Sequence, residues 1–303
     1  MACFTSRTGY GCAIALLAAL GSAAPARADI LYAADHGTSA IVKFTSNGVG
    51  SDFAGIGTGL AFDHAGNLYA SRGNAIEKLT PGGVESVFAT SGLSGPEAVA
   101  FDSAGNLYAA NESNSTIEKF SPTGTDLGVF AASGLVNPRG LAFDSAGNLY
   151  ASNFSTGTIE KFSPAGSDLG IFGGTGTPQV AGLAFDHVGN LYVANEWSNN
   201  IVMFTPGGVR SVFANTRPSS DPLGLAFDSA GNLYVADQQS GGIEMFTPGG
   251  IGSVFAGRVL HPYFLAFSND AGVPLPLANT PEPAGLSLLA LGGIGLLRRR
   301  RQT

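Results

Sequence analysis

The fold is decided by a ten-residue stretch, LAFDSAGNLY, at residues 141–150. A Leu-Ala-Phe run precedes Asp-x-x-Gly-Asn, and Leu-Tyr follows it. The Asp side chain can accept hydrogen bonds from backbone N–H groups two or three residues on, and Gly adopts the positive φ of a tight turn. The stretch therefore predicts two short strands joined by a turn. The same turn recurs along the chain, with its aspartates at Asp63, Asp102, Asp144, Asp186 and Asp228.

The spacing of these copies indicates a repeat architecture. Successive turn aspartates are 39 residues apart once and 42 residues apart thereafter, a period typical of propellers and solenoids. Each period holds four short β signals: Leu-Ala-Phe, Leu-Tyr-x-Ala, a run such as residues 117–120, and a run such as residues 87–89. Four strands in about 40 residues predict a propeller blade. No window keeps a helical period, which excludes helical repeats.

The number of blades follows from two sets of strand signals. Leu-Tyr occurs six times, with its tyrosines at Tyr32, Tyr69, Tyr108, Tyr150, Tyr192 and Tyr234. The preceding apolar strand also occurs six times, but the last copy, residues 265–267, has no Leu-Tyr after it, and the first Leu-Tyr has no such strand before it. We therefore predict an all-β, six-bladed propeller over residues 29–273, closed when the C-terminal strand pairs with the N-terminal blade.

The motif resembles the NHL repeat and, more loosely, the six-bladed gluconolactonase-like propellers. The quoted copies carry this resemblance over about residues 29–270. It implies the fold directly. It implies little about function, because propellers serve as enzymes, as binding modules and as scaffolds.

The first 28 residues are expected to be a secretory signal peptide. Arg7 supplies the positive start, an apolar run covers residues 13–24, and residues 26–28 form a small-x-small cleavage pattern. Cleavage would fall between Ala28 and Asp29. Both cysteines of the chain lie within this segment, so the exported chain is expected to have neither disulfides nor thiol chemistry.

The C-terminal residues 281–303 have the three parts of a sorting tail. Residues 274–280 form a linker before these parts. The first part is a Pro-Glu-Pro motif and the second is an apolar stretch over residues 284–297. A basic cluster follows, so that the residues of the motif and the cluster are Pro281, Glu282, Pro283, Arg298, Arg299, Arg300 and Arg301. This order resembles the PEP-CTERM sorting signal of Gram-negative bacteria, which implies recognition and processing by an exosortase. Fourteen helical residues span about 21 Å, so the apolar stretch would be a short or transient membrane anchor.

Composition and charge exclude several classes of protein. Charged residues make up only 12% of the chain, whereas Gly numbers 44 and aromatic residues reach 10%. This composition is typical of a turn-rich β protein with a core. Residues 29–280 hold 9 Lys and Arg against 21 Asp and Glu, a formal charge of about −12. That balance argues against nucleic acid or anionic lipid as a partner.

Candidate site residues lie in loops that differ between the repeats. One end of the ring should carry the Asp-x-x-Gly-Asn and Pro-x-Gly turns, which barely vary, and the other should carry the variable loops. A ligand site is expected at the variable end. Its candidate residues are Glu97, Arg139, Phe154, Trp197 and Tyr263. Trp197 is the only Trp, and an aromatic among Asn and Ser suits a carbohydrate or protein partner.

The lactonase-like resemblance implies a different site, a divalent metal such as Ca²⁺ held by Glu, Asn and Asp side chains near the central channel. The candidates for it are Glu97, Asn153 and Asn195. Two features weaken this alternative, because the neighbouring Arg139 would oppose a cation and the regular recurrence of the asparagines indicates loop capping. No Ser/His/Asp arrangement is legible, and no cofactor is otherwise expected.

The sequence thus predicts an exported, non-enzymatic propeller of the cell surface or extracellular matrix that binds a protein or a polysaccharide. Its other expected partners are the export and exosortase-type sorting machinery. A metal-dependent, lactonase-like hydrolase on the same fold is the alternative, and a matrix scaffold without a defined ligand is a third possibility.

Overall fold

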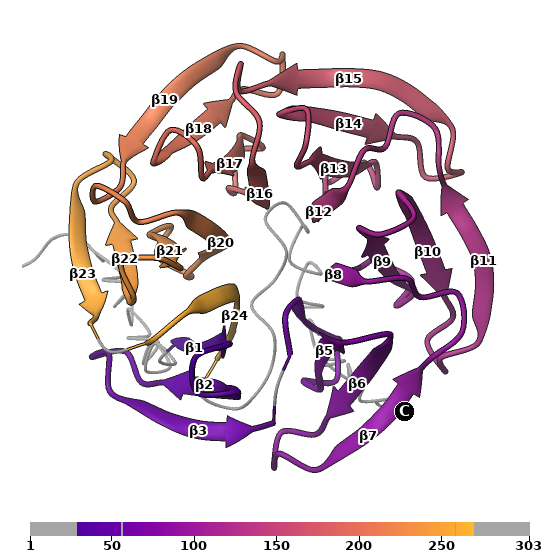
Figure 1. Ribbon diagram of the computed structural model, residues 1–303, viewed down its shortest axis with the longest axis horizontal. Coiled ribbons are helices and arrows are strands. Elements are labelled where there is room, and N and C mark those ends of the chain that lie inside the picture. The colour runs from indigo at the N-terminus through magenta and orange to yellow at the C-terminus, as the bar shows by residue number, and fades with distance from the viewer. Residues whose placement is uncertain (1–28, 56, 258, 270–303) are drawn as a thin grey trace, which may run out of the picture.

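The computed structural model describes residues 29–55, 57–257 and 259–269. These residues form a closed ring of six antiparallel, four-stranded sheets around a central axis, as the sequence predicts (Figure 1). The segments predicted to be a signal peptide, a linker and a sorting tail lie outside the described residues. Within the described ranges, no helix has the length and hydropathy that a membrane span requires.

The strands are numbered in chain order, and each blade is listed from the axis outward. Blade 1 consists of β24 (Pro262–Asn269), β1 (Asp29–Asp35), β2 (Ala40–Phe44) and β3 (Gly50–Ala54). Blade 2 consists of β4 (Leu60–Phe62), β5 (Leu68–Arg72), β6 (Ala75–Leu79) and β7 (Glu85–Ala89). Blade 3 consists of β8 (Pro96–Phe101), β9 (Leu107–Asn111), β10 (Thr116–Phe120) and β11 (Asp126–Ala131).

The remaining blades follow the same order. Blade 4 consists of β12 (Pro138–Phe143), β13 (Leu149–Asn153), β14 (Thr158–Phe162) and β15 (Asp168–Gly174). Blade 5 consists of β16 (Val180–Phe185), β17 (Leu191–Asn195), β18 (Asn200–Phe204) and β19 (Arg210–Asn215). Blade 6 consists of β20 (Pro222–Phe227), β21 (Leu233–Asp237), β22 (Ile243–Phe246) and β23 (Gly252–Ala256).

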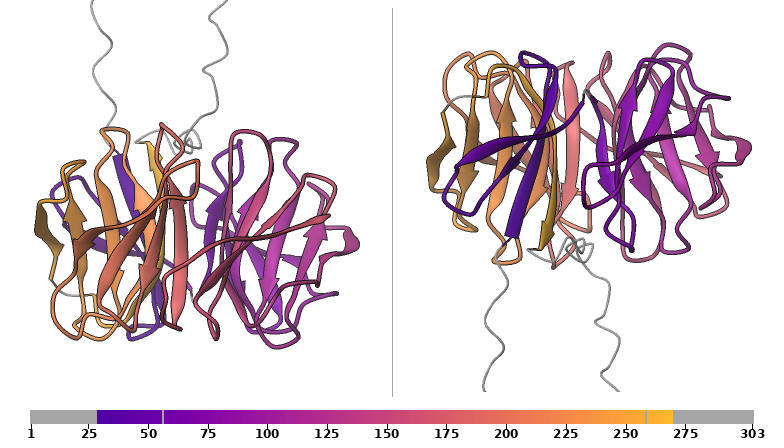
Figure 2. Two further views of the ribbon diagram at one scale, coloured as in Figure 1. Left: turned by 90° about the horizontal axis from the view of Figure 1, so that it is seen from above. Right: turned by 90° about the horizontal axis from the view of Figure 1, so that it is seen from below.

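The ring is closed by the last strand. β24 pairs antiparallel with β1, and Leu31 lies opposite Phe267 in the register. The predicted closure is confirmed, and it pairs the inner edge of β1. Asp29 lies opposite Asn269, so the described chain begins and ends at the same end of the ring (Figure 2).

The core lies between the blades. All five residues of β9, β13, β17 and β21 are buried, because neighbouring blades cover both faces of these strands. In each blade, the tyrosine of the second strand packs edge-on against two phenylalanines. Tyr150, for example, contacts Phe172 of its own blade at 5.0 Å and Phe185 of the next blade at 5.1 Å. Such pairs contribute about 0.5–1.5 kcal/mol each beyond their burial.

The last of these tyrosines connects blade 6 to the closing strand. Tyr234 of β21 packs against Phe267 of β24 with ring centroids 4.9 Å apart. The repeated Leu-Tyr and Leu-Ala-Phe signals therefore specify both the strands and the contacts that stack one blade on the next.

Candidate functional site

The two ends of the ring differ, as the sequence predicts. The turn face carries the Asp-x-x-Gly-Asn turns between the first and second strands of the blades. The loop face carries the loops between the second and third strands and those that lead from each blade to the next. Because strands in a blade alternate in direction, the two sets of connections lie at opposite ends of the ring (Figure 2).

The aspartates of the turn face are held by hydrogen bonds within their own turns. Asp144 Oδ1 accepts from the backbone N–H groups of Ala146 and Asn148, both at 2.9 Å. Its Oδ2 accepts from Asn148 Nδ2 at 2.8 Å and from the Tyr150 hydroxyl at 3.2 Å. The sequence predicted backbone donors two or three residues after the aspartate. In the structure they lie two and four residues after it. The same four bonds recur at Asp63, Asp102 and Asp186.

Lysines of the third strands complete this arrangement. Lys161 Nζ lies 3.7 Å from Asp144 Oδ2 and 4.9 Å from the centroid of the Tyr150 ring. Lys78 and Lys119 take the same positions in blades 2 and 3. These side chains support the turns, and their regularity indicates a structural role for the turn face.

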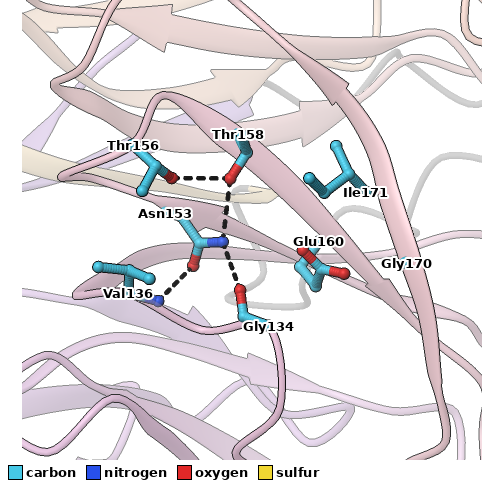
Figure 3. A pocket seen from close by; sticks show the side chains of 8 residues that line it. All are labelled: Gly134, Val136, Asn153, Thr156, Thr158, Glu160, Gly170 and Ile171. Atoms are coloured by element: carbon cyan, nitrogen blue, oxygen red, sulfur yellow. Dashed lines mark hydrogen bonds between the residues drawn. The ribbon is translucent and has the colours of Figure 1, made fainter.

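At the loop face, asparagines that end the second strands hold the neighbouring loops. Asn153 Oδ1 accepts from the Val136 N–H at 2.9 Å, and Asn153 Nδ2 donates to the Gly134 carbonyl at 2.8 Å and to Thr158 Oγ1 at 3.1 Å (Figure 3). These residues border an open groove of about 540 Å³ with a largely apolar lining. Asn111 makes the equivalent bonds in blade 3.

The two asparagines that the sequence offers as metal candidates, Asn153 and Asn195, are hydrogen-bonded within the loops. The amide of Asn153 is engaged in the loop, and Asn195 Oδ1 accepts from Thr177 Oγ1 at 3.1 Å. Both asparagine side chains are buried among their loops. Across residues 29–55, 57–257 and 259–269, no group of three His, Cys, Asp or Glu side chains has the geometry of a metal site. The two asparagines therefore act as loop caps, which is the role that their recurrence indicates.

A charged cluster occupies the centre of the loop face. Arg139 of β12 directs its Nε to Glu112 Oε1 at 2.9 Å and its NH1 group to Glu196 Oε1 at 3.5 Å. Its guanidinium carbon lies 3.5 Å from the centroid of the Phe154 ring. Glu97 of β8 lies near enough to Arg139 and Glu112 for both to influence the pKa of its carboxyl group. Three glutamates from separate segments thus surround one arginine.

Two of these carboxyl groups titrate near neutrality. The pKa of Glu97 is raised to about 7. Burial is the main cause and the neighbouring Glu112 adds to it, whereas Arg139 opposes the shift. Burial likewise raises the pKa of Glu196 to about 7, again opposed by Arg139. Carboxyl groups that remain partly protonated at neutral pH are candidates for a functional site.

Aromatic side chains border the cluster. The His36 ring stacks on the Tyr263 ring with centroids 4.0 Å apart. The pKa of Tyr263 is raised by burial and by Glu97, which places its hydroxyl group within the influence of the cluster. Trp197 follows Glu196 in the chain and is 62% exposed. The loop face therefore combines a charged centre with an exposed aromatic at its rim.

The sequence predicted some of the residues in this cluster. Glu97, Arg139 and Tyr263 interact electrostatically, and Phe154 lies against the Arg139 guanidinium. Glu112 and Glu196 were not predicted as site residues. Their positions in the repeat could have indicated them, because each directly follows an Asn that ends a second strand.

Comparisons with known proteins agree with the fold. The model of a family described as strictosidine synthase-like, N-terminal, matches residues 86–113, a short stretch within blades 2 and 3. The comparison with curated proteins gave no match.

Solved structures match over most of the chain. A chain of the nidogen/laminin complex is 21% identical, with 79% of this chain and 98% of that chain covered and a TM-score of 0.71. Virginiamycin B lyase from Staphylococcus aureus is 14% identical, with 70% and 77% covered and a TM-score of 0.59. A streptogramin B lyase is 16% identical, with 75% and 72% covered and a TM-score of 0.55. At these identities the likeness is one of fold: the chain is a six-bladed β-propeller related in fold to the nidogen and virginiamycin B lyase propellers.

Proposed function

We propose that this protein is an exported, non-enzymatic propeller that binds a partner protein or polysaccharide through its loop face. The observation that carries the proposal is the 62% exposure of Trp197 beside the Arg139 cluster. A large exposed aromatic is costly to hydrate, and Trp is enriched among the residues that dominate binding energies. The turn face has repeated, internally satisfied hydrogen bonds, and the large apolar side chains exposed there, such as Val84, Val188 and Ile251, are aliphatic.

The positions of Asp29 and Asn269 support a surface location. These two residues, where the described chain begins and ends, pair with each other at the turn face. A C-terminal tail that anchors the protein to the cell envelope would therefore hold the turn face toward the envelope and the loop face away from it. This is the orientation that a binding platform needs.

The proposed C-terminal sorting signal can be tested separately. If the tail is a PEP-CTERM signal that an exosortase processes, the mature surface protein from the native host should lack Arg298 to Arg301. Intact-mass spectrometry measures this directly. Secreted material that keeps all four arginines would contradict processing.

The binding face is tested by two tryptophan substitutions. Trp197→Ala should weaken binding of a partner captured from the surface fraction by about 2 kcal/mol or more, because it removes the large aromatic side chain that anchors the partner. It should barely change the melting temperature, since the side chain is exposed. Ser145→Trp adds a bulky aromatic at the exposed turn of the opposite face and should leave binding unchanged. Equal effects of the two variants would contradict the proposal.

A further inference from the structure

The centre of the loop face has more carboxyl groups than cations. Glu97, Glu112 and Glu196 surround Arg139, and Asp221 acts on Glu196 from the loop before β20. Arg139 alone would repel a second cation, but here its charge is outnumbered at least threefold when the carboxyl groups are ionised. The cluster therefore has room, electrostatically, for another positive charge.

One acceptor in the cluster has no hydrogen bond. Glu196 Oε1 is buried and accepts none, and the NH1 group of Arg139 is 3.5 Å away. The Glu196 side chain as a whole is only 11% exposed. A buried carboxylate oxygen without a donor is unfavourable, and a ligand that brings a charged N–H group would relieve that cost.

Near neutral pH, protons partly neutralise the carboxyl groups of Glu97 and Glu196. The pKa of Glu97 and that of Glu196 are both raised to about 7, first by burial and then by neighbouring carboxylates. A cation that enters the cluster would stabilise the ionised forms and expel these protons. Binding and ionisation should therefore be linked.

The walls of the cluster suit a cation. Phe154 already holds one guanidinium against its face at 3.5 Å, and the Tyr263 ring, which stacks on His36, is near enough to Glu97 for that carboxylate to raise its pKa. Aromatic faces attract ammonium and guanidinium groups, most strongly where water is excluded. Carboxylates and aromatic faces together are the usual receptor for such groups.

We propose that this cluster receives the side-chain ammonium of a lysine on a partner protein, which is held by Glu97 and Glu196. The inference rests on the proposed function, since it names the chemistry that the loop face binds. A lysine has the flexible four-carbon stem needed to bring its charge to carboxyl groups below the rim. The ammonium of an amino sugar is attached directly to its ring and lacks that reach. The charge of about −12 over residues 29–280 also favours a basic partner.

The probe for the test is tetralysine, compared with tetralysine acetylated at every Nε, with binding to the full chain measured by calorimetry. The unmodified peptide should bind and the acetylated one should not. Glu97→Gln and Glu196→Gln keep the side-chain shape and should each weaken binding about tenfold or more. Glu85→Gln is the matched control. Glu85 lies on the outer strand β7, 3.5 Å from Arg72, and its loss should leave the affinity unchanged.

A pH series separates this site from diffuse attraction. The charged and titratable groups that face the cluster are Glu97 of β8, Glu112 after β9, Arg139 of β12, Glu196 after β17, Asp221 before β20, Tyr263 of β24 and His36 after β1. Affinity for tetralysine should rise between about pH 6 and pH 8, because Glu97 and Glu196 lose their protons across this range. In both Gln variants that rise should shrink.

Each outcome has a distinct meaning. Equal loss in Glu85→Gln and in the two cluster variants, or an affinity that is flat from about pH 6 to pH 8, overturns the lysine site. Glucosamine oligomers that bind as tightly as tetralysine, and that lose affinity in Glu196→Gln, would assign the cluster to a polysaccharide and also overturn it. If Trp197→Ala abolishes capture of the partner while both Gln variants do not, the lysine inference fails and the proposed function stands.

Discussion

At the scale of single residues, one aspartate organises each turn. Asp144 accepts four hydrogen bonds, two from backbone N–H groups and two from the side chains of Asn148 and Tyr150. Burial and the Asp144 charge both raise the pKa of the Tyr150 hydroxyl, which therefore acts as a donor at all ordinary pH values. Gly147 takes a φ of 80° in this turn, a conformation that residues with a side chain adopt at a cost.

Removal of this aspartate should be expensive. Asp144→Ala leaves the Tyr150 hydroxyl and the Asn148 amide without their acceptor, so the free energy of unfolding should fall by about 2–4 kcal/mol. Urea denaturation followed by circular dichroism measures the change. Asp52→Ala is the control, because Asp52 is exposed on the outer strand β3, and it should cost about 0.5 kcal/mol or less. Equal midpoints for the two variants would show that the turn does not depend on the carboxylate.

The residues of the candidate site were harder to predict than those of the turns. The turn aspartates repeat, so their role could be read from five copies at once. Glu112 and Glu196 occupy equivalent positions after their second strands, but blade 4 has Phe154 there and blade 1 has His36. A site built from positions that differ between blades carries no repeat signal. Only the closed ring shows that these positions meet around one axis.

At the scale of strands, the repeated pattern was sufficient for the inner strands and incomplete for the outer ones. Leu-Tyr-x-Ala predicted the second strands, and β9, β13, β17 and β21 prove to be buried along their whole length. The third strands hold a less obvious feature, since Glu118 of β10 and Glu160 of β14 are almost fully buried. The pKa of each is raised to about 7, first by burial and then by the neighbouring Asp126 or Asp168.

The burial of these glutamates could not be predicted from the sequence alone, because an Ile-Glu-Lys-Phe strand has the same sequence whether its Glu is buried or exposed. Register shifts between the third and fourth strands fall at Glu118 and Glu160, and the same shift falls at Glu77 of β6, which is only half-buried. Blade 5 has the apolar Val202 at the equivalent position, also buried. Burial at this position therefore differs between blades that share the same bulge.

At the scale of the whole molecule, the orphan strand signals determined the topology. Six Leu-Tyr strands and six Leu-Ala-Phe strands, offset by one, require the C-terminal strand to join the N-terminal blade, and β24 does so. The closing blade is also held by polar contacts. Asp35 Oδ1 accepts from the His261 N–H at 2.9 Å, and Asp29 Oδ2 accepts from the Ser229 N–H at 2.7 Å. The second of these ties blade 1 to blade 6.

A truncation tests how much the ring depends on this closure. A chain that stops before Val259 loses β24 and with it the buried side chains of Leu265 and Phe267, each of which contributes about 1.5–3 kcal/mol when fully buried. It also exposes the inner edge of β1 and leaves Tyr234 with only one of its two edge-on partners, Phe255. The truncated chain should therefore melt far lower than a chain ending at Thr280, or should not unfold cooperatively, when both are followed by calorimetry. The chain ending at Thr280 keeps all described strands and should melt like the longer protein. Equal melting temperatures for the two truncations would mean that the blades are stable without a closed ring, as in an open solenoid.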